Sequence, residues 1–447
     1  MTASTALDLA VYTDPAAMRA SMQAQLPGFA EGRLRIDALA VRHVLRNTSR
    51  ERNPCPMTLC YELQVSDPLE GRRGTQWLCA QVYRNGLAAP AHAQQDRARL
   101  VAPAFGQALV HLPALDLLLW ALPNDPGLPQ LAALLDPAEA ARLLPGTLAG
   151  AVQVELLRYA PQRRATLRFT IDGGADGAAA SRTLYAKTFC DDRAGTLHER
   201  FDHFWQLAQH DEHAPLVAPP LGRDERIRTL WQAPAQGTPL LPCLTSTDGA
   251  MLLGRVAHAL ARLHAAPLSL SVPLSAGATP RSVAHWLAEV RRRQQKLGRH
   301  DAALAARAAW VADAIEAHAA HPSTRPLGLI HGDFHPEQVW VHEGRIVLFD
   351  FDEFTLGDPM EDLAEFVLKL GHAGVAPALA SAFVEQYAAA APQRFDRRSL
   401  AWHLTIQNLL QASRAFIYQQ PGWAATLERR LAASEVRAAA LRYPSAA

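Results

Sequence analysis

The sequence predicts an α+β protein with two β-rich parts followed by a mostly helical part. Three observations support this fold class. Two stretches before residue 245 share one order of strands and turns. After residue 245, apolar residues recur at three- and four-residue steps, which is typical of helices. Two short apolar strands then interrupt the helical part, on either side of a polar motif that begins at residue 331.

The two β-rich parts are residues 41–130 and residues 152–240. Each runs strand, polar turn, strand, strand, then Val-Ala-Pro, then Leu-Trp and a turn with proline. The alternating segments "TLCYELQV" and "TLRFTI" are typical of half-buried antiparallel strands. We interpret the two parts as degenerate copies of one small β-rich unit. The domains we expect are therefore 1–148, 149–245 and 246–447.

The two copies differ at one position that can carry charge. Aligning "LCAQVY" with "LYAKTF" places Gln81 of the first copy against Lys187 of the second. The second copy also has room for a helix over residues 195–210, whose apolar residues recur at three- and four-residue steps. If Lys187 takes part in chemistry, the first copy has lost that function and serves as structure.

Several helices are predicted in the last part. The segment "DGAMLLGRVAHALARLHAAP" places its leucines on one face and ends at Pro267. Residues 281–298 and 301–320 predict two further helices, and residues from Met360 onward continue with helical spacing. The short apolar strands lie in "RPLGLIHGD" and "GRIVLFDFD".

Composition excludes several classes of protein. At 447 residues the chain can bury two or three cores, and 49% hydrophobic with 19% charged residues indicates a soluble globular protein. The net charge of +1, from 44 basic and 43 acidic residues, provides no broad surface for nucleic acid or an anionic membrane. The basic stretch 289–300 is interpreted as the solvated face of a helix.

The cysteines and the N-terminus indicate where the protein works. Five scattered cysteines without a Cys-x-x-Cys pair favour a reducing compartment. The first residues lack a secretory signal pattern, and no apolar stretch is long enough to cross a membrane. We therefore expect a cytoplasmic protein, either a monomer or a homodimer.

The segment "HGDFHPEQVWVHEGRIVLFDFDEF", residues 331–354, carries the candidate chemistry. A loop holding Asp333 and Gln338 is followed by a predicted hairpin whose second strand leads to Asp350. These three side chains can then meet in one small space. Carboxylate and amide oxygens suit Mg²⁺, which shares its coordination shell with phosphates. Phosphoryl transfer needs that charge neutralisation and a carboxylate to orient the acceptor hydroxyl.

This segment resembles the aminoglycoside phosphotransferase and choline kinase group of small-molecule kinases. The likeness lies in "HGDFHPEQVWV", "LFDFDEFTLGDPMEDLAEF", "LARLHAAP" and "ASRAFIYQQPGW". It implies a bilobal protein-kinase-like fold with a β-rich N-lobe and a mostly helical C-lobe. Most members have Asn where this chain has Gln338. The maltokinase and glucosamine kinase branch is similar in using Gln there, and it carries an extra N-terminal cap that the first β-rich copy could match.

The resemblance implies a role for each candidate residue. Asp333 would be the catalytic base, and ATP and Mg²⁺ the cofactors. Adenine would bind the backbone of the hinge 230–237. The turn "YAPQRRAT" has no glycine, so phosphate contacts there would use backbone amides and an arginine. The remaining assignments are Gln338, Asp350 and Asp352 for the metal, Lys187 and Arg164 for phosphates, Glu199 as the partner of Lys187, and Gln232 and Ala233 for adenine.

Plainer interpretations exist for several acidic residues and histidines. Asp358 and Asp362, like Glu353 and Glu361, could line the acceptor side, or the two aspartates could cap the helix that begins near Pro359. His331 and His335 are interpreted as hydrogen-bonded structural residues, since no His/Cys spacing suits zinc.

The predicted activity is ATP-dependent phosphorylation of a small-molecule hydroxyl, on a sugar or amino sugar. Two alternatives stay open at this stage. One is an aminoglycoside-modifying resistance kinase. The other is a pseudokinase that binds nucleotide without turnover, which the missing glycine and Gln338 would favour.

Overall fold

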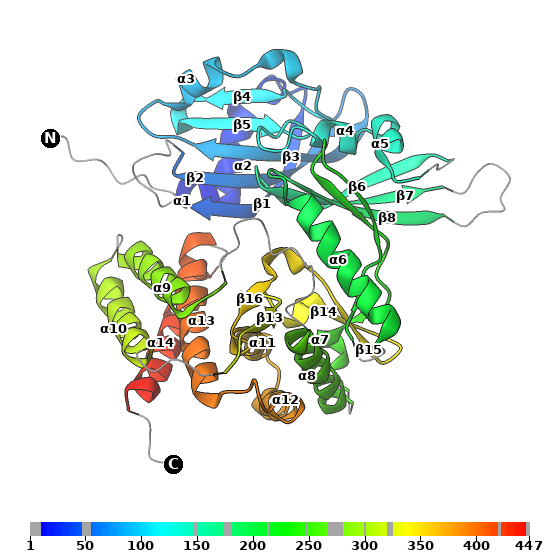
Figure 1. The fold of residues 1–447 in the computed structure, drawn as a ribbon. Coiled ribbons are helices and arrows are strands. Elements are labelled where there is room, and N and C mark those ends of the chain that lie inside the picture. The colour runs from blue at the N-terminus through cyan, green and yellow to red at the C-terminus, as the bar shows by residue number, and fades with distance from the viewer. Residues whose placement is uncertain are drawn as a thin grey trace. The chain divides into compact units, whose positions relative to one another are not determined.

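The computed structural model describes residues 10–46, 55–146, 150–172, 181–211, 214–246, 248–266, 280–298, 301–319, 325–418 and 422–443. The chain divides into two compact units (Figure 1). Unit 1 comprises residues 1–192, 224–229 and 417–421. Unit 2 comprises residues 193–223, 230–416 and 422–447. The β-rich N-terminal part and the helical C-terminal part confirm the predicted α+β class, whereas the three domain boundaries and the N-terminal cap stay predictions.

Unit 1 begins with a five-stranded antiparallel sheet covered by α2. The strands are β1 (Arg35–Arg46), β2 (Met57–Asp67), β3 (Arg72–Val82), β4 (Leu109–Leu112) and β5 (Leu117–Ala121), in the order β1-β2-β3-β5-β4. Helix α2 (Pro15–Gln25) starts where Asp14 accepts hydrogen bonds from the backbone of Ala16 and Ala17. Its Met18 and Met22 are fully buried against the sheet, in one core with apolar residues of β1, β2, β3 and β5. The smaller elements here are α1 (Ala10–Thr13), α3 (Ala88–Ala93), η1 (Arg97–Arg99) and η2 (Pro113–Leu115).

The second sheet repeats the strand order of the first. After α4 (Leu131–Leu135) and α5 (Pro137–Leu143) come β6 (Val152–Ala160), β7 (Arg164–Ile171) and β8 (Arg182–Phe189). Strands β10 (Pro220–Asp224) and β11 (Thr229–Gln232) complete the order β6-β7-β8-β11-β10. Within unit 1, β8 meets the start of β11, where the backbone N–H of Phe189 donates to the carbonyl of Arg228 at 3.1 Å.

The registers of the two sheets also correspond. Gln81 of β3 lies opposite Thr58 of β2, and Lys187 of β8 lies opposite Thr166 of β7. The sequence alignment of Gln81 with Lys187 thus matches equivalent places in two sheets of the same order. This supports the duplication hypothesis.

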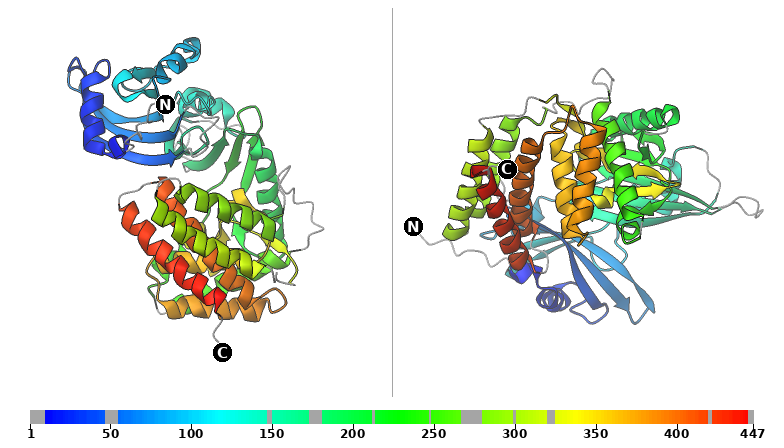
Figure 2. Two further views of the ribbon diagram at one scale, coloured as in Figure 1. Left: turned by 90° about the vertical axis from the view of Figure 1, so that its left-hand side faces the viewer. Right: turned by 90° about the horizontal axis from the view of Figure 1, so that it is seen from below.

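The helical part belongs to unit 2. Its helices are α6 (Arg193–His210), α7 (Leu240–Cys243), α8 (Gly249–Ala265), α9 (Val283–Gly298), α10 (Ala302–Ala319), α11 (Met360–His372), α12 (Pro377–Ala390), α13 (Arg397–Tyr418) and α14 (Trp423–Arg442). Helices α9 and α10 confirm the two helices predicted from residue 281 to residue 320. Figure 2 shows α9 and α10 beside α14, and the three share an apolar core with α13. Among the described residues, no helix combines the length and the apolar character needed to span a bilayer.

Two small sheets of unit 2 lie among these helices. Strands β12 (Thr238–Pro239), β14 (Val339–His342), β15 (Arg345–Leu348) and β9 (Leu216–Val217) form one sheet in that order. β13 (Gly328–Ile330) pairs antiparallel with β16 (Thr355–Gly357). The β14–β15 hairpin turns at Glu343 and Gly344, which both have positive φ, as a tight two-residue hairpin turn requires. The predicted hairpin is therefore present, and it separates two loops that carry the candidate site.

Candidate functional site

The loop that carries Asp333 is fixed through the backbone that precedes it. The N–H groups of His331 and Gly332 donate to the carboxylate of Asp362 at 2.7 and 2.9 Å. Asp362 is buried on α11 and also lies 3.0 Å from Nε2 of His264. Burial alone would raise the pKa of Asp362, but the hydrogen bond from His264 and the nearby imidazoles and amides lower it. Asp362 therefore anchors the loop, which neither of its sequence-based interpretations anticipated.

Gly332 has to be glycine at this position. Its φ is +80°, a region that residues with a side chain rarely adopt. A Cβ atom there would lie 2.3 Å from the carbonyl oxygen of Glu353. The His-Gly-Asp motif thus permits the loop after β13 to pass close to the loop after β15.

The two histidines of the motif hold the loop together. His331 is fully buried, and its Nε2 lies 2.7 Å from the carbonyl oxygen of Phe349. Nε2 of His335 lies 3.9 Å from Oδ2 of Asp333. Burial lowers the pKa of His335, although the Asp333 carboxylate opposes that shift. His331 thus makes the structural hydrogen bond expected from the sequence, whereas His335 lies near Asp333 at an ion-pair distance.

Asp333 is partly accessible, with 33% of its side chain exposed. It lies within electrostatic reach of Glu365, a buried carboxylate of α11. Burial, with the charge of Asp333 next in effect, raises the pKa of Glu365 to about 7. The predicted base is thus an accessible carboxylate on a fixed loop.

Gln338 and Asp350 meet as predicted. Gln338 ends the short helix η3 (Pro336–Gln338) and is mostly buried. Its side-chain Nε2 donates to Oδ2 of Asp350 at 3.4 Å, and its backbone carbonyl accepts from the N–H of Phe349 at 3.0 Å. Asp350 has a φ of +61° and precedes the short helix η4 (Phe351–Glu353), which contains Asp352. Aspartate tolerates this left-handed conformation better than most residues.

The Gln338–Asp350 pair fits a divalent cation in type and number of oxygen ligands. The described part of the chain has no group of three or more His, Cys, Asp or Glu residues that could hold a metal by themselves. Mg²⁺ does not need such a cage, because it binds one or two protein oxygens together with waters and phosphate oxygens. The site therefore suits Mg²⁺ that arrives with a nucleotide.

Arg200 holds the loop of Asp350 and Asp352 in place, and the sequence analysis missed it. It is 1% exposed on α6, and its Nη1 donates to the carbonyl oxygen of Phe351 at 3.0 Å. Phe204 of the same helix stacks on Phe351, with ring centroids 4.7 Å apart. A sequence signal did exist, because Arg200 stands three residues after Leu197 and four before Phe204, on the apolar face of the helix.

The predicted phosphate contacts lie in unit 1. Lys187 is half-buried on β8, with its Nζ 5.7 Å from the ring centroid of Phe189. Arg164 is exposed at the first residue of β7. The glycine-free turn before β7 contains Gln162, which adopts a positive φ of 59°.

Residues of the first repeat hold both this turn and β8. Asp125 accepts hydrogen bonds from the N–H of Gln162 at 2.8 Å and from the hydroxyl of Tyr159 at 2.5 Å. Gln130 donates through Nε2 to the hydroxyl of Thr188 and the carbonyl of Phe189, both at 2.8 Å. The side chains of Asp125 and Gln130 thus support the turn and the strand that carry the predicted phosphate ligands.

The other nucleotide candidates lie in unit 2. Glu199 forms an ion pair with Arg223, at 3.0 Å, so its pairing with Lys187 stays a prediction. Gln232 ends β11, and its Nε2 is buried without a hydrogen-bond partner. The N–H of Ala233 donates to the carbonyl of Pro219 at 2.9 Å. Gln232 therefore has an amide donor to offer a ligand, while the Ala233 N–H is already used.

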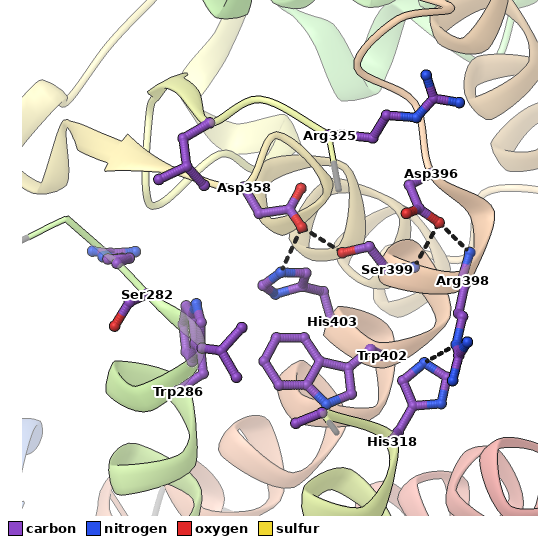
Figure 3. A pocket seen from close by; sticks show the side chains of 14 residues that line it. Ser282, Trp286, His318, Arg325, Asp358, Asp396, Arg398, Ser399, Trp402 and His403 are labelled. Atoms are coloured by element: carbon purple, nitrogen blue, oxygen red, sulfur yellow. Dashed lines mark hydrogen bonds and ion pairs between the residues drawn. The ribbon is translucent and has the colours of Figure 1, made fainter. Parts of the chain in front are cut away.

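A cavity of about 270 Å³ lies in unit 2 between the start of α9, the end of α10 and the start of α13 (Figure 3). Indole rings of Trp286 and Trp402 line it together with polar side chains. Asp358 precedes Pro359, the N-cap of α11, and accepts hydrogen bonds from the N–H of Met360 and from the Ser399 hydroxyl. His403 is 1% exposed, and its Nε2 lies 3.6 Å from Oδ2 of Asp358.

Part of the chain is similar to a known protein family. Residues 206–403, which include the His-Gly-Asp loop and the β14–β15 hairpin, match the phosphotransferase enzyme family. The match covers less than half of the chain. The protein is an enzyme, a small-molecule phosphotransferase. No curated protein matches the chain.

Solved structures with some likeness to this phosphotransferase include two kinds of kinase. A choline kinase from Cryptosporidium parvum Iowa II has a TM-score of 0.48 at 10% identity, covering 66% of this chain and 90% of its own. An aminoglycoside phosphotransferase, APH(4)-Ia, solved with ADP and hygromycin B, has a TM-score of 0.46 at 17% identity, covering 66% and 96%. These values are too low to assign a substrate to the phosphotransferase.

Proposed function

We propose that the protein is an ATP-dependent kinase that phosphorylates a hydroxyl group of a sugar or amino sugar. The observation that carries the proposal is the contact of Gln338 with Asp350 beside the fixed, accessible loop of Asp333. An amide, a carboxylate and a second carboxylate in adjacent loops are the groups that phosphoryl transfer to an alcohol requires.

In this proposal each side chain has one task. Asp333 orients the acceptor hydroxyl and takes its proton as the oxygen attacks the γ-phosphorus of ATP, while the bond to the bridging oxygen breaks and ADP leaves. Gln338 and Asp350 would hold Mg²⁺, with Asp352 as a further ligand, and the ion would supply charge neutralisation on the phosphates. Lys187 and Arg164 bind phosphate oxygens, and Glu199 orients Lys187. The unpartnered amide of Gln232 hydrogen-bonds adenine, together with the carbonyl of Ala233.

The cavity beside α9 and α13 supports a polyhydroxylated acceptor. A volume of about 270 Å³ suits a small polar molecule. The indole rings offer apolar faces, while Ser399, His403 and Asp358 offer polar groups. Arg281 lines this cavity and donates to the carbonyl of Gly332, the residue before Asp333. The wall of the cavity therefore reaches the loop of the proposed base.

An acceptor screen tests the proposal. Purified protein with Mg-ATP is incubated with sugars, amino sugars and aminoglycosides, and mass spectrometry reports a gain of one phosphoryl group. We expect a product from a sugar or amino sugar, and a loss of at least about 100-fold in kcat for Asp333→Asn. Glu337→Gln is the matched control, because it removes an exposed carboxylate from the same loop.

Two outcomes would contradict the proposal. One is wild-type turnover by folded Asp333→Asn protein, which would exclude Asp333 as the base. The other is product from aminoglycosides alone, which would exclude the assigned acceptor class.

A further inference from the structure

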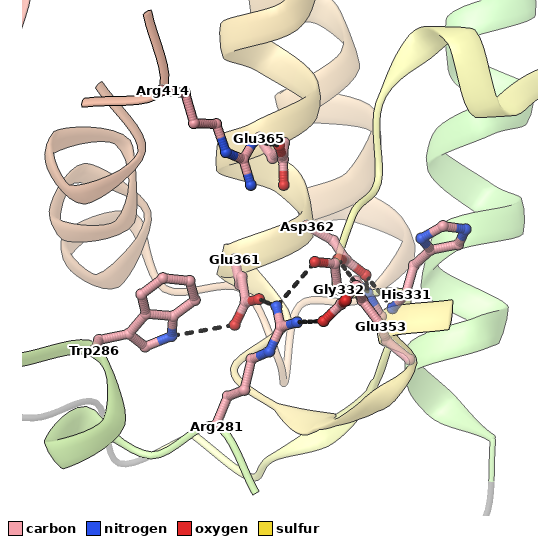
Figure 4. A network of polar contacts seen from close by, with 10 residues as sticks. Arg281, Trp286, His331, Gly332, Glu353, Glu361, Asp362, Glu365 and Arg414 are labelled. Carbon is pink, nitrogen blue, oxygen red and sulfur yellow. Dashed lines mark hydrogen bonds and ion pairs between the residues drawn. The ribbon is translucent and has the colours of Figure 1, made fainter. Parts of the chain in front are cut away.

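Arg281 contacts several parts of the candidate site, and the proposed function gives it no role of its own (Figure 4). It precedes α9, and its side chain is only 13% exposed. Its backbone N–H donates to the carbonyl of Leu356 in β16 at 2.8 Å, so the main chain is fixed before the side chain begins. The guanidinium then reaches three separate parts of unit 2.

Each of these three contacts is adjacent in sequence to a residue of the proposed site. Nη1 donates to the carbonyl oxygen of Gly332 at 2.9 Å, one residue before Asp333. Nη2 donates to Glu353 at 2.9 Å, one residue after Asp352. Nη1 also pairs with buried Glu361, one residue before the loop anchor Asp362. The planar guanidinium of Arg281, with its several fixed donors, thus links the Asp333 loop, the Asp350–Asp352 loop and the start of α11.

We propose that Arg281 is a positioning residue that keeps the Asp333 loop and the Asp350–Asp352 loop in register. The inference rests on the function proposed for those loops. Gly332 is held from two sides, with its N–H on Asp362 and its carbonyl on Arg281. Without the guanidinium, the carbonyl side loses its partner and the link to Glu353 is broken, although Asp362 still holds the amides.

The energetics of this arrangement favour positioning over stability. A buried ion pair adds little net stability, since the desolvation of both groups offsets their attraction. Glu361 illustrates the cost, because burial raises its pKa to about 7 against the opposing effect of Arg281. The Trp286 indole donates to the second oxygen of Glu361 at 3.2 Å and orients this carboxylate toward Arg281. An apolar cluster at this place would stabilise the fold at least as well. The polar cluster therefore contributes mainly by fixing the positions of the loops.

Hydrogen–deuterium exchange tests the inference without any need for turnover. Arg281→Ala and Arg281→Lys are compared with Arg255→Ala, which removes another arginine bonded to a loop carbonyl, that of Gly344 at 3.0 Å. We expect several-fold faster exchange in peptides covering residues 331–338 and 350–354 in both Arg281 variants. Lysine should not restore protection, because a point charge cannot bridge three acceptors. Arg255→Ala should leave both peptides unchanged.

Kinetics supply the second readout. With an acceptor from the screen, we expect Arg281→Ala to lower kcat by about 100-fold while KM for nucleotide stays near the wild-type value. Unchanged exchange in both peptides would overturn the positioning role, whether or not the wild type has activity. Faster exchange spread evenly over the whole chain would also overturn it, since that pattern indicates a stabilising residue. A wild type without any phosphorylated product contradicts the proposed function instead, and leaves the exchange comparison to decide on Arg281.

Discussion

At the scale of single residues, burial raises the pKa of two carboxyl groups on α11. Glu361 and Glu365 stand one helical turn apart, and burial raises the pKa of each to about 7. Glu365 has Asp333 and Glu361 as neighbouring negative charges, and Arg414 and Lys369 as neighbouring positive charges. Both carboxylates therefore change charge near neutral pH, next to the proposed base.

This shift predicts how Glu365 affects stability. A carboxyl group whose pKa is raised in the folded state stabilises the fold most fully below its ordinary value of 4.5, and that stability is lost as the pH rises through 7. We expect Glu365→Gln to gain unfolding free energy relative to wild type between pH 5 and pH 8, by up to about 3 kcal/mol. Urea unfolding at several pH values measures the difference.

A matched substitution provides the control for that series. Glu385→Gln changes an exposed carboxylate on α12 and should follow the wild type across the same pH range. If the unfolding free energies of Glu365→Gln and wild type differed by the same amount from pH 5 to pH 8, burial would not raise the pKa of Glu365.

At the scale of elements, α6 connects to the Asp350–Asp352 loop through Arg200 and two aromatic contacts. Its Phe201 and Phe204 pack on Phe351, with centroids 5.4 and 4.7 Å apart. Arg200 adds polar links to the backbone of η4, where its Nη1 donates to the carbonyls of Phe351 at 3.0 Å and Asp352 at 3.5 Å. The helix therefore fixes the loop in two ways, by apolar packing and by a directed hydrogen bond.

Arg200→Met separates these two contributions. Methionine keeps the length and the apolar contacts but removes the donor to Phe351, so we expect a small change in stability and at least about tenfold weaker Mg-ATP binding. Isothermal titration calorimetry and thermal unfolding measure the two effects. Arg262→Met, which removes an exposed ion pair with Asp211, should alter neither. Equal affinities for Arg200→Met and wild type would show that aromatic packing alone positions the loop.

At the scale of the whole molecule, unit 1 shows how the two β-rich repeats depend on each other. Asp125 lies near the end of the first repeat, and it is buried against Tyr159 and Gln162 of the second. It also accepts from the N–H groups of Gly127 and Leu128, so its carboxylate oxygens are fully used. A Cβ on Gly127 would lie 2.6 Å from the Cα of Gln162, which shows how closely the segments approach.

Asp125→Ala should therefore affect both repeats. It leaves buried donors on Tyr159 and Gln162 without a partner, and we expect a loss of about 3 kcal/mol in unfolding free energy together with weaker nucleotide binding. Denaturation and calorimetry measure the two quantities. The control is Asp136→Ala, which removes only the exposed N-cap of α5 and should cost about 1 kcal/mol without a change in affinity. Unchanged nucleotide affinity in Asp125→Ala would separate the first repeat from the nucleotide site.

Much of the site was predictable because its signals are local. The spacing of Asp333, Gln338 and Asp350 around a two-residue hairpin turn fixes which side chains can meet, and Gln338 does contact Asp350. The helices from residue 249 onward follow the recurrence of apolar residues. Strand alternation likewise predicted two β-rich repeats, and the sheets share one strand order. Gln338 and Asp350 stand only 12 positions apart, and the helix and strand patterns are periodic over neighbouring residues.

The supports of the site were decided by tertiary structure. Arg200 lies 151 positions from Phe351, and Arg281 lies 51 positions from Gly332, so no local pattern connects them. Asp362 had two plausible local roles and adopted a third, because the loop after β13 passes over α11 with two amides that need an acceptor. The sequence alone determined which polar groups the two loops of the proposed site carry and their order along the chain. Only the fold decided which distant side chains hold them, because the desolvated backbone groups and charges of a buried loop must find partners wherever the packing brings them.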